Sequence, residues 1–372
     1  MYKTRVCYIA DMAHHYREPI FRLMAERFSC HFYFGDKPST IKEVSLSDLP
    51  GFQGRLRYRK LPGGAHYLSG AVSKALAYKK IVLLGDPHGI HNWIICLLGR
   101  LLGRDVYLWT HGWYGNETVA KGILKKFLFR LASRILVYGP RSKKLLITEG
   151  FSADRIKVVF NSLDYDRQVY IRSRDDRNET FFRYFGNSNP VIVYVGRVQK
   201  IKRLDLLVKA LDRLKQEGLA VNFVLIGGVG DDRSIQELVE HSGLSDSVWF
   251  YGPCYDESEI CNIISHSDVC VSPGNVGLTA IHALTYGCPV ITHNDFSKQM
   301  PECEAIIPGE TGDFFNYGDI ADIALKIRFW IEKRKKFRKT VSDQCYSEIS
   351  KRWNPHVQIE RIGEALELYN DR

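Results

Sequence analysis

The sequence predicts an α/β protein with two doubly wound parallel sheets. The chain has 372 residues, too many for one compact core, which favours two domains of roughly 150–200 residues. Short β-branched runs alternate with helical patterns, a rhythm typical of parallel strands covered by helices. The rhythm stops in a polar segment at residues 164–190 and then restarts. We therefore expect one domain on each side of that segment.

The first half of the chain supplies the elements of the first domain. Residues 5–10 form an apolar run, and residues 18–28 carry a helical pattern with Pro19 in the first turn, where proline is tolerated. An apolar run, WIICLLGRLLG, predicts a buried helix, since it is shorter than the roughly 18 residues that a membrane span needs. Further strands are predicted at residues 30–34, 81–84, 106–110, 135–138 and 157–160, and helices at 93–102 and 121–132.

The second half repeats this rhythm without detectable sequence repetition. Segment 164–190 is rich in Arg, Asp and Asn and is interpreted as the link between domains. We predict domains at residues 1–165 and 166–351, with a C-terminal helix at 352–372 that can pack back on the first domain. Strands are predicted at residues 191–195, 222–226, 248–251, 269–272 and 290–292, and helices at 204–217, 234–241, 257–265, 278–286 and from about 320.

Composition narrows the class of protein. Hydrophobic residues make up 45% and charged residues 25% of the chain, as in soluble globular proteins. The net charge of +10 fits nucleotide phosphates, nucleic acid or an acidic membrane surface, although plain solubility explains it equally well. Without a recognised nucleic-acid module, no nucleic-acid partner is expected. Nine scattered cysteines without a CxxC pair, and no signal peptide, favour a reduced cytoplasmic protein.

The stretch at residues 269–295 is a candidate anion site. It reads as strand, turn, helix and strand, with Gly274 and Asn275 in the turn. Unpaired backbone N–H groups at the helix start, together with the positive end of the helix dipole, can hold a phosphate. An ordinary βα turn has the same pattern, so the stretch alone leaves both readings open. The N–H groups concerned belong to Gly277, Leu278 and Thr279.

A pair of cations follows the first strand of the second domain, in VGRVQKIKRLD at residues 195–205. Gly196 lets the chain turn, Arg197 lies at the strand end, and Lys202 stands at the start of the next helix. Opposite Gly277, the two cations would form a two-sided clamp for a diphosphate. Each cation alone could be a solvated surface charge. The GxGxxG and GxxxxGK[ST] motifs are absent, which argues against a nicotinamide cofactor and P-loop hydrolysis.

VGRVQKIKRLD resembles the VGRL…K signature of retaining glycosyltransferases of the GT4 type, which have the GT-B fold. The stretch at 269–295 resembles their second signature, E-G-F-G-L-x-x-x-E-A-x-x-x-G-x-P-V. FNSLDYD at 160–166 and WTHGWYG at 109–115 are similar to segments of bacterial surface-polysaccharide members. The resemblance covers most of the chain in order. It implies two Rossmann-like domains facing each other across a cleft, with acceptor binding in the first and nucleotide-sugar binding in the second.

The resemblance implies a retaining, metal-independent hexosyltransferase that uses a UDP- or GDP-sugar as substrate and needs no cofactor. Its acceptor would be a saccharide, lipid-linked in lipopolysaccharide, O-antigen or other surface-polysaccharide assembly. Two rivals stay open: a nucleotide-sugar 2-epimerase of the same fold, and a catalytically silent nucleotide-sugar-binding protein. The donor-binding residues that it implies are Gly196, Gly274, Asn275, Val276, Gly277, Leu278, Thr279 and His282, and the catalytic residues are His111, Arg197 and Lys202.

One departure from the family pattern is important. The Glu-x7-Glu pair of the second signature falls on Gly274 and His282, so both carboxylates are missing. The amide of Asn275 could take part of the first role, and His282 could reach ribose hydroxyls. The loss motivates the silent rival. Retention of Arg197, Lys202 and His111 favours a variant active site.

The remaining candidates lie in the first domain and in one acidic segment of the second. His111 follows a strand beside glycines and aromatics, where it could contact the donor sugar or carry a proton near neutral pH; a structural loop histidine fits too. Glu302 and Glu304 could hold donor hydroxyls or the ribose. The acceptor candidates, which could equally be surface loop residues, are Asp11, His14, His15 and Arg17.

The helix predicted at residues 121–132 is cationic and amphipathic. Its basic residues are interleaved with apolar ones, a pattern that could dock on anionic lipid. A core-facing helix with a solvated basic side has the same pattern. We expect a cytoplasmic protein that can associate with the inner face of the plasma membrane. The basic residues concerned are Lys121, Lys125, Lys126, Arg130 and Arg134.

Overall fold

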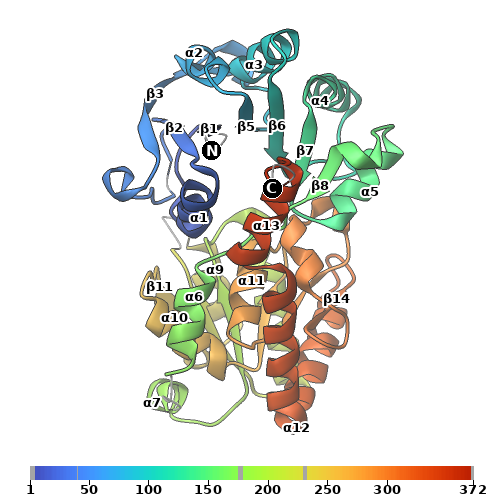
Figure 1. Ribbon diagram of the computed structural model, residues 1–372. Helices are drawn as coiled ribbons and strands as arrows, with labels where there is room; N and C mark the ends of the chain where they lie inside the picture. Colours follow the sequence, from blue (N-terminus) through green and yellow to red (C-terminus); the bar gives the residue numbers. More distant parts are fainter. Residues whose placement is uncertain (1–4, 40, 175–178, 229–232, 370–372) are drawn as a thin grey trace. The chain divides into compact units, whose positions relative to one another are not determined.

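The computed structural model describes residues 5–39, 41–174, 179–228 and 233–369. The chain divides into two compact units (Figure 1). The first unit joins Met1–Asp164 to Asn354–Arg372, and the second is Tyr165–Trp353. The C-terminal helix thus belongs to the same unit as the first strand.

The first unit contains an eight-stranded sheet in the order β4-β3-β2-β1-β5-β6-β7-β8. All neighbouring strands are parallel except β3 and β4, which form an antiparallel hairpin at one edge. Sequence analysis did not predict this hairpin, because β3 buries only one side chain and carries no apolar run. The strands are β1 (Val6–Ala10), β2 (His31–Gly35), β3 (Phe52–Lys60), β4 (His66–Ser69), β5 (Lys80–Leu84), β6 (Asp105–Thr110), β7 (Arg134–Val137) and β8 (Ile156–Val158).

Helices cover both faces of this sheet, because side chains of each central strand alternate between two cores. Tyr8 packs in the core under α1 and α13, whereas Ile9 packs in the core under α3 and α4. The C-terminal helix is anchored by Gln358, whose amide donates to Phe160 O (2.8 Å) and accepts from Ser162 Oγ (2.6 Å). The helices are α1 (Glu18–Phe28), α2 (Ala71–Leu76), α3 (Ile90–Leu101), α4 (Val119–Leu131), α5 (Pro140–Thr148) and α13 (Pro355–Ala365).

Helix α3 departs from the prediction of a buried helix. Its Ile95 and Cys96 are fully buried, but Leu97 is 51% and Leu101 is 73% exposed. The prediction is therefore wrong for one face of the helix, because apolar residues surround α3 and the sheet covers only one face. No helix in the described parts of the chain combines the length and apolar content needed to cross a membrane.

The second unit contains a six-stranded parallel sheet in the order β11-β10-β9-β12-β13-β14. The order in which strands are added to the sheet changes direction between β9 and β12. Open α/β sheets bind ligands at such a switch point, beyond the carboxyl ends of the strands. The strands are β9 (Val191–Val195), β10 (Asn222–Ile226), β11 (Val248–Gly252), β12 (Val269–Ser272), β13 (Val290–His293) and β14 (Gly312–Phe315).

The segment interpreted as a link contributes two helices, α6 and α7, to the second unit. Arg172 in α6 donates to Thr285 O (2.6 Å), and its guanidinium lies 3.7 Å from the ring centre of Tyr346. These contacts hold α6 in the second unit, which begins at Tyr165, near the start of the predicted link. Residues 175–178 of that segment lie outside the described residues, and its interpretation as a link stays a prediction. The helices are α6 (Tyr165–Arg172), α7 (Thr180–Phe185), α8 (Leu204–Gln216), α9 (Ser234–His241), α10 (Glu257–His266), α11 (Leu278–Thr285) and α12 (Ile320–Arg352).

Candidate functional site

Two loops of the second unit are joined at the switch point. One follows β9 and the other follows β12, so both lie at the carboxyl edge of the sheet. Gly274 N donates to Lys202 O (2.8 Å). The Lys202 ammonium donates to Asn275 O (2.8 Å) and to Asn275 Oδ1 (2.7 Å). The structure therefore brings together the lysine and the glycine-bearing loop that the sequence predicts to share a diphosphate.

Gly274 explains why the family's first carboxylate is missing. A Cβ atom at this position would lie 2.0 Å from Ile201 O and 2.7 Å from the Lys202 Cα. No side chain fits at that distance, because the neighbouring atoms are backbone. The close approach of the two loops thus requires glycine. The amide oxygen of Asn275, predicted to contact the donor sugar, is engaged with Lys202.

The start of α11 is held in place on the neighbouring strand. Thr279 Oγ1 donates to Val195 O (2.7 Å), and Val276 N donates to Gln299 Oε1 (2.9 Å). Gly277 is the N-cap, and the first N–H groups of a helix have no intrahelical acceptor. Within the described residues, no acceptor pairs with the N–H groups of Gly277, Leu278 or Thr279. These groups can therefore receive an anion.

Gly196 begins the loop after β9. Its φ of 148° lies in the region that glycine alone adopts readily, and its N–H donates to Ile226 O (2.9 Å). Arg197, the next residue, is exposed at the strand end, and its carbonyl accepts from Tyr194 OH (3.1 Å). The loop thus turns on Gly196 and places a cation at the edge of the sheet.

Lys202 is an electrostatically sensitive cation. Burial is the main cause that lowers the pKa of Lys202 to about 8, and the charge of Arg197 lowers it further. The carboxylate of Glu302, which is buried in the short helix Pro301–Ala305, acts in the opposite direction. A bound anion would stabilise the protonated form in the same way. An ammonium whose protonated form gains stability when an anion binds is expected of a phosphate-binding lysine.

His282 lies one turn into α11 and pairs with a residue that sequence analysis missed. Its Nε2 lies 2.8 Å from Glu257 Oε1, at the start of α10. Glu257 is 25 residues away along the chain, and its only local signal is a place at a predicted helix start. The second unit therefore has a carboxylate beside the position where the family's second glutamate is missing.

The first of the acceptor candidates, Asp11, is buried at the end of β1. Its Oδ2 accepts from Lys37 Nζ (2.9 Å), and its Oδ1 lies 3.2 Å from His66 Nε2. Burial alone would raise the pKa of Asp11, but the hydrogen bonds from His66 and Lys37 outweigh it and bring the pKa to about 2. One potential ligand atom from each of Asp11, His66 and His91 lies within 4.8 Å of the others. Because Lys37 already balances the carboxylate, we interpret the cluster as a hydrogen-bonded core.

Arg17 does not fit its predicted contact with the acceptor, because its side chain is buried. The guanidinium lies 4.8 Å from the ring centre of Trp109 and donates to the hydroxyls of Tyr138 and Tyr8. Arg17 is thus part of the aromatic core.

His14 and His15 are only partly buried and so stay available as acceptor candidates. Burial is the main cause that lowers the pKa of His14 to about 4.

His111 follows β6 among aromatic rings. Its ring centre lies 5.0 Å from that of Tyr138 and 6.2 Å from that of Tyr114. Burial lowers the pKa of His111 to about 4, and the charges of Arg17 and Lys125 add to this effect. The imidazole is therefore neutral at pH 7. The proton transfer near neutral pH that the sequence predicts for His111 stays a prediction.

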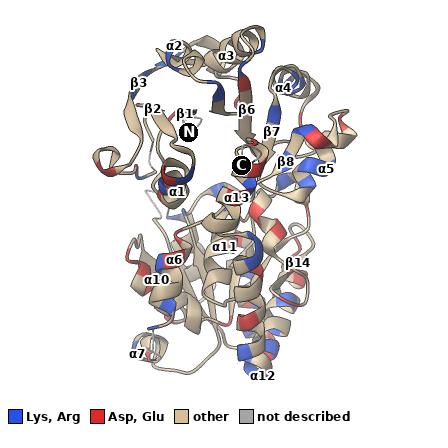
Figure 2. Cartoon of the chain, viewed as in Figure 1, with Lys and Arg blue, Asp and Glu red and all other residues tan. Residues whose placement is uncertain are grey.

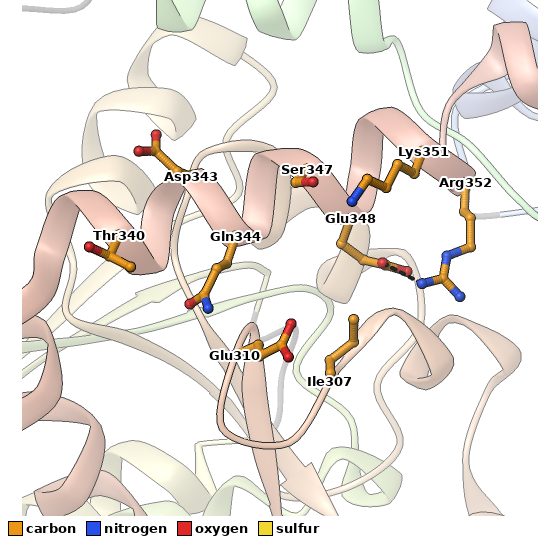
Figure 3. A pocket seen from close by; sticks show the side chains of 9 residues that line it. All are labelled: Ile307, Glu310, Thr340, Asp343, Gln344, Ser347, Glu348, Lys351 and Arg352. Carbon is orange, nitrogen blue, oxygen red and sulfur yellow. Dashed lines mark hydrogen bonds and ion pairs between the residues drawn. The ribbon is translucent and has the colours of Figure 1, made fainter.

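A separate pocket lies in the second unit between α12 and the loop at residues 307–310, with a volume of about 520 Å³ (Figure 3). Most of the residues that line it have polar or charged side chains, and Glu348 there accepts from Arg352 (2.8 Å) and Trp353 (3.2 Å). None of the predicted site residues lines this pocket. It is distinct from the switch-point loops.

Comparison with known proteins agrees with this arrangement. The model of the family described as glycosyl transferases group 1 matches residues 176–346. An uncharacterized 41.2 kDa protein in the cps region of Klebsiella pneumoniae is 27% identical over 63% of this chain and 63% of its own length. The capsular polysaccharide biosynthesis glycosyltransferase CapM of Staphylococcus aureus is 24% identical over 67% of this chain and 64% of its own length. The chain thus matches less than two thirds of the length of these relatives.

Solved structures resemble the whole chain. A glycosyltransferase from Rickettsia africae has a TM-score of 0.78 at 13% identity and covers 100% of both chains. HepE of Anabaena, solved with UDP, has a TM-score of 0.76 at 16% identity and covers 98% of this chain and 99% of its own. These likenesses establish the GT-B fold, with its two Rossmann-like domains. Over residues 176–346 of its second unit, the chain is similar to the group 1 glycosyl transferases.

Proposed function

We propose that this protein is a glycosyltransferase that transfers a sugar from a nucleotide diphosphate sugar to a saccharide acceptor in surface-polysaccharide synthesis. The observation that carries the proposal is the junction of Lys202 with the loop before α11 at the switch point. The similarity to CapM, a capsular polysaccharide biosynthesis glycosyltransferase, and to HepE, which binds UDP and glucose, supports it. The second unit binds the donor, and the first binds the acceptor.

The chemistry requires stabilisation of the leaving diphosphate. The bond between the sugar C1 and the phosphate oxygen breaks, and the electron pair leaves with the diphosphate. An acceptor hydroxyl forms the new bond to C1 on the face that the diphosphate left, and its proton passes to the oxygen of the leaving diphosphate. Lys202, Arg197 and the N–H groups at the start of α11 neutralise the charge that develops, without a metal ion. Retention follows the GT4-type resemblance, and the donor base is uracil or guanine.

An assay with a panel of UDP- and GDP-sugars tests this proposal. We expect nucleotide diphosphate to be released from one of these donors only when a lipid-linked saccharide acceptor is present, and NMR of the product to give the donor's anomeric configuration. A donor converted to its epimer without an acceptor would favour the 2-epimerase. Binding without turnover for any acceptor would favour the silent protein. Failure to bind any nucleotide diphosphate would contradict all three functions.

We also propose that the first unit associates with an anionic membrane through the α3–α4 surface. On this surface Leu101 is 73% exposed, Val119 is 80% exposed and Phe127 is 57% exposed. Two cations predicted for membrane contact are already paired, since Lys125 contacts Glu117 (2.8 Å) and Lys126 contacts Glu149 (2.5 Å). The α3–α4 surface comprises the apolar Ile90, Leu97, Leu101, Leu102, Val119, Ile123, Leu124 and Phe127 and the basic Arg100, Lys121 and Arg130.

Basic residues mark α4 in Figure 2, so the apolar side chains are flanked by charge that complements acidic lipid. The double variant Leu101→Glu/Phe127→Glu is expected to bind vesicles of phosphatidylglycerol and phosphatidylcholine at least about tenfold more weakly, because it removes two apolar contacts with lipid. Sedimentation with vesicles measures this. As a control, Phe337→Glu changes an equally exposed apolar side chain on α12 and should leave vesicle binding unchanged. Equal loss in both variants would contradict a role for the α3–α4 surface.

A further inference from the structure

The carboxylate of Glu257 is held by an unusual set of partners. Its Oε1 accepts from Tyr286 OH (2.6 Å) and from Gln168 Nε2 (2.9 Å), and lies 2.8 Å from His282 Nε2. An ionised carboxylate only accepts hydrogen bonds, so His282 donates through Nε2. Three donors from three different positions on α6 and α11 therefore converge on one oxygen. This fixes the orientation of the whole carboxylate group.

The other oxygen of the same carboxylate has a different environment. Within the described residues, no donor pairs with Glu257 Oε2, and 19% of the side chain is accessible to solvent. Burial alone would raise the pKa of Glu257, but the charge of His282 and the three hydrogen bonds outweigh it and lower the pKa to about 2. Glu257 is also the first residue of α10, where the helix dipole favours negative charge. Oε2 is thus an ionised, oriented acceptor open to a ligand.

The position of this acceptor relates it to the phosphate-binding loops. α10 begins after β11 and α11 begins after β12, so both helix starts lie at the carboxyl edge of one sheet. His282 is five residues beyond Gly277, a rise of about 7 Å along the helix. In a nucleoside diphosphate, the ribose is the group that follows the phosphates. The carboxylate that pairs with His282 therefore stands where ribose hydroxyls are expected.

We propose that Glu257 Oε2 accepts a hydrogen bond from a ribose hydroxyl of the donor nucleotide, with His282, Tyr286 and Gln168 as positioning residues. This inference rests on the proposed function of the second unit. It replaces the earlier expectation that His282 itself contacts the ribose, since the ring nitrogen Nε2 is directed to Glu257. The carboxylate missing at position 282 is then supplied from a different helix.

The inference predicts that the protein discriminates between nucleotides that contain ribose and those that contain deoxyribose. A site built to pair with a hydroxyl rejects a ligand that lacks it, because the charged acceptor is left without a partner. The wild-type protein is expected to bind UDP or GDP at least about tenfold more tightly than the 2′-deoxy or the 3′-deoxy form of the same nucleotide. Glu257→Ala is expected to weaken binding of the ribonucleotide and to bind ribo- and deoxynucleotides about equally.

Isothermal titration of these nucleotides with the full chain tests the inference. Glu259→Ala is the matched control, because it removes a carboxylate from the same first turn of α10 and should keep the wild-type discrimination. Tyr286→Phe removes one of the three donors and should reduce discrimination partially, an effect that a merely structural role would not produce. If Glu257→Ala does not fold, Glu257→Gln keeps the shape without the charge and should still reduce the discrimination.

The outcomes distinguish a failure of the proposed function from a failure of the role proposed for Glu257. Failure of the wild-type protein to bind any nucleoside diphosphate would contradict the proposed function. Tight binding with equal discrimination in the wild-type protein and in both Glu257 variants would overturn the role of Glu257, and the proposed function would stand. Equal loss of discrimination in Glu257→Ala and Glu259→Ala would also overturn it, since the effect would then come from the charge at the helix start.

Discussion

Lys202→Ala is expected to weaken the binding of UDP or GDP by roughly 10- to 100-fold, the usual effect of removing a charge-assisted hydrogen bond. Arg197→Ala should act in the same direction, and the double variant should have no detectable transferase activity. The reason is that both cations stand at the edge of the sheet beside the start of α11. Isothermal titration and nucleotide release measure the two effects. Lys209→Ala, an exposed lysine on the adjacent helix, should bind as the wild type does.

The pH dependence of binding gives an independent check on Lys202. Its pKa of about 8 in the free protein means that the ammonium loses its proton as the pH rises through that value. Since the diphosphate binds the protonated form, affinity should be highest below about pH 8 and fall above it. Lys202→Arg stays charged, so its affinity should be nearly constant between about pH 7 and pH 9. A wild-type affinity that did not change over this range would contradict a phosphate contact for Lys202.

Gly274→Ala is the second change with a large expected effect. The new Cβ would lie 2.0 Å from Ile201 O, so the loop after β9 must move away from the loop before α11. We expect stability to fall by about 1–3 kcal/mol, as for other overpacked sites, and nucleotide binding to be lost as in Lys202→Ala. Gly274→Glu would restore the family's carboxylate in sequence but should be at least as damaging, because the side chain has no space.

Thermal unfolding and nucleotide titration measure these effects. Gly228→Ala provides the steric control, since a Cβ there would meet no atom of the described residues within 4 Å, and its unfolding temperature should equal that of the wild type. A Gly274→Glu variant with increased transferase activity would show that the loops separate easily and would contradict this account of the missing carboxylate.

Much of the fold follows from local sequence. The prediction of a helix at residues 18–28 is confirmed, and so are the strands Val191–Val195 and Asn222–Ile226, because their apolar periods are unambiguous. The hairpin of β3 and β4 was missed because Arg55, Arg57 and Arg59 occupy alternate positions of β3 and leave it without an apolar run. Helix α6 was missed because its polar sequence is stabilised by contacts with distant parts of the unit.

Part of the candidate site could likewise be predicted from the sequence, and part could not. The proximity of Lys202 to the loop before α11 could be predicted because loops after parallel strands meet at one edge of a sheet. Glu257 could not, because its partners come from α6 and α11, and no local pattern links them. The neutral state of His111 depends on burial and on Arg17, which lies far away in the chain. Site residues that follow parallel strands can be recognised in a sequence. Contacts between side chains from distant segments can be found only in the structure.

The return of the chain to its first unit has a consequence for synthesis. The second unit is continuous, whereas the first is completed by α13, which packs against α1 and carries the Gln358 contacts. Domains on the ribosome usually fold in the order in which they emerge. Here the part made first lacks α13 until the whole second unit has been made, so the second unit can mature earlier. A stop codon shortly before α13 would therefore damage the beginning of the protein more than its end.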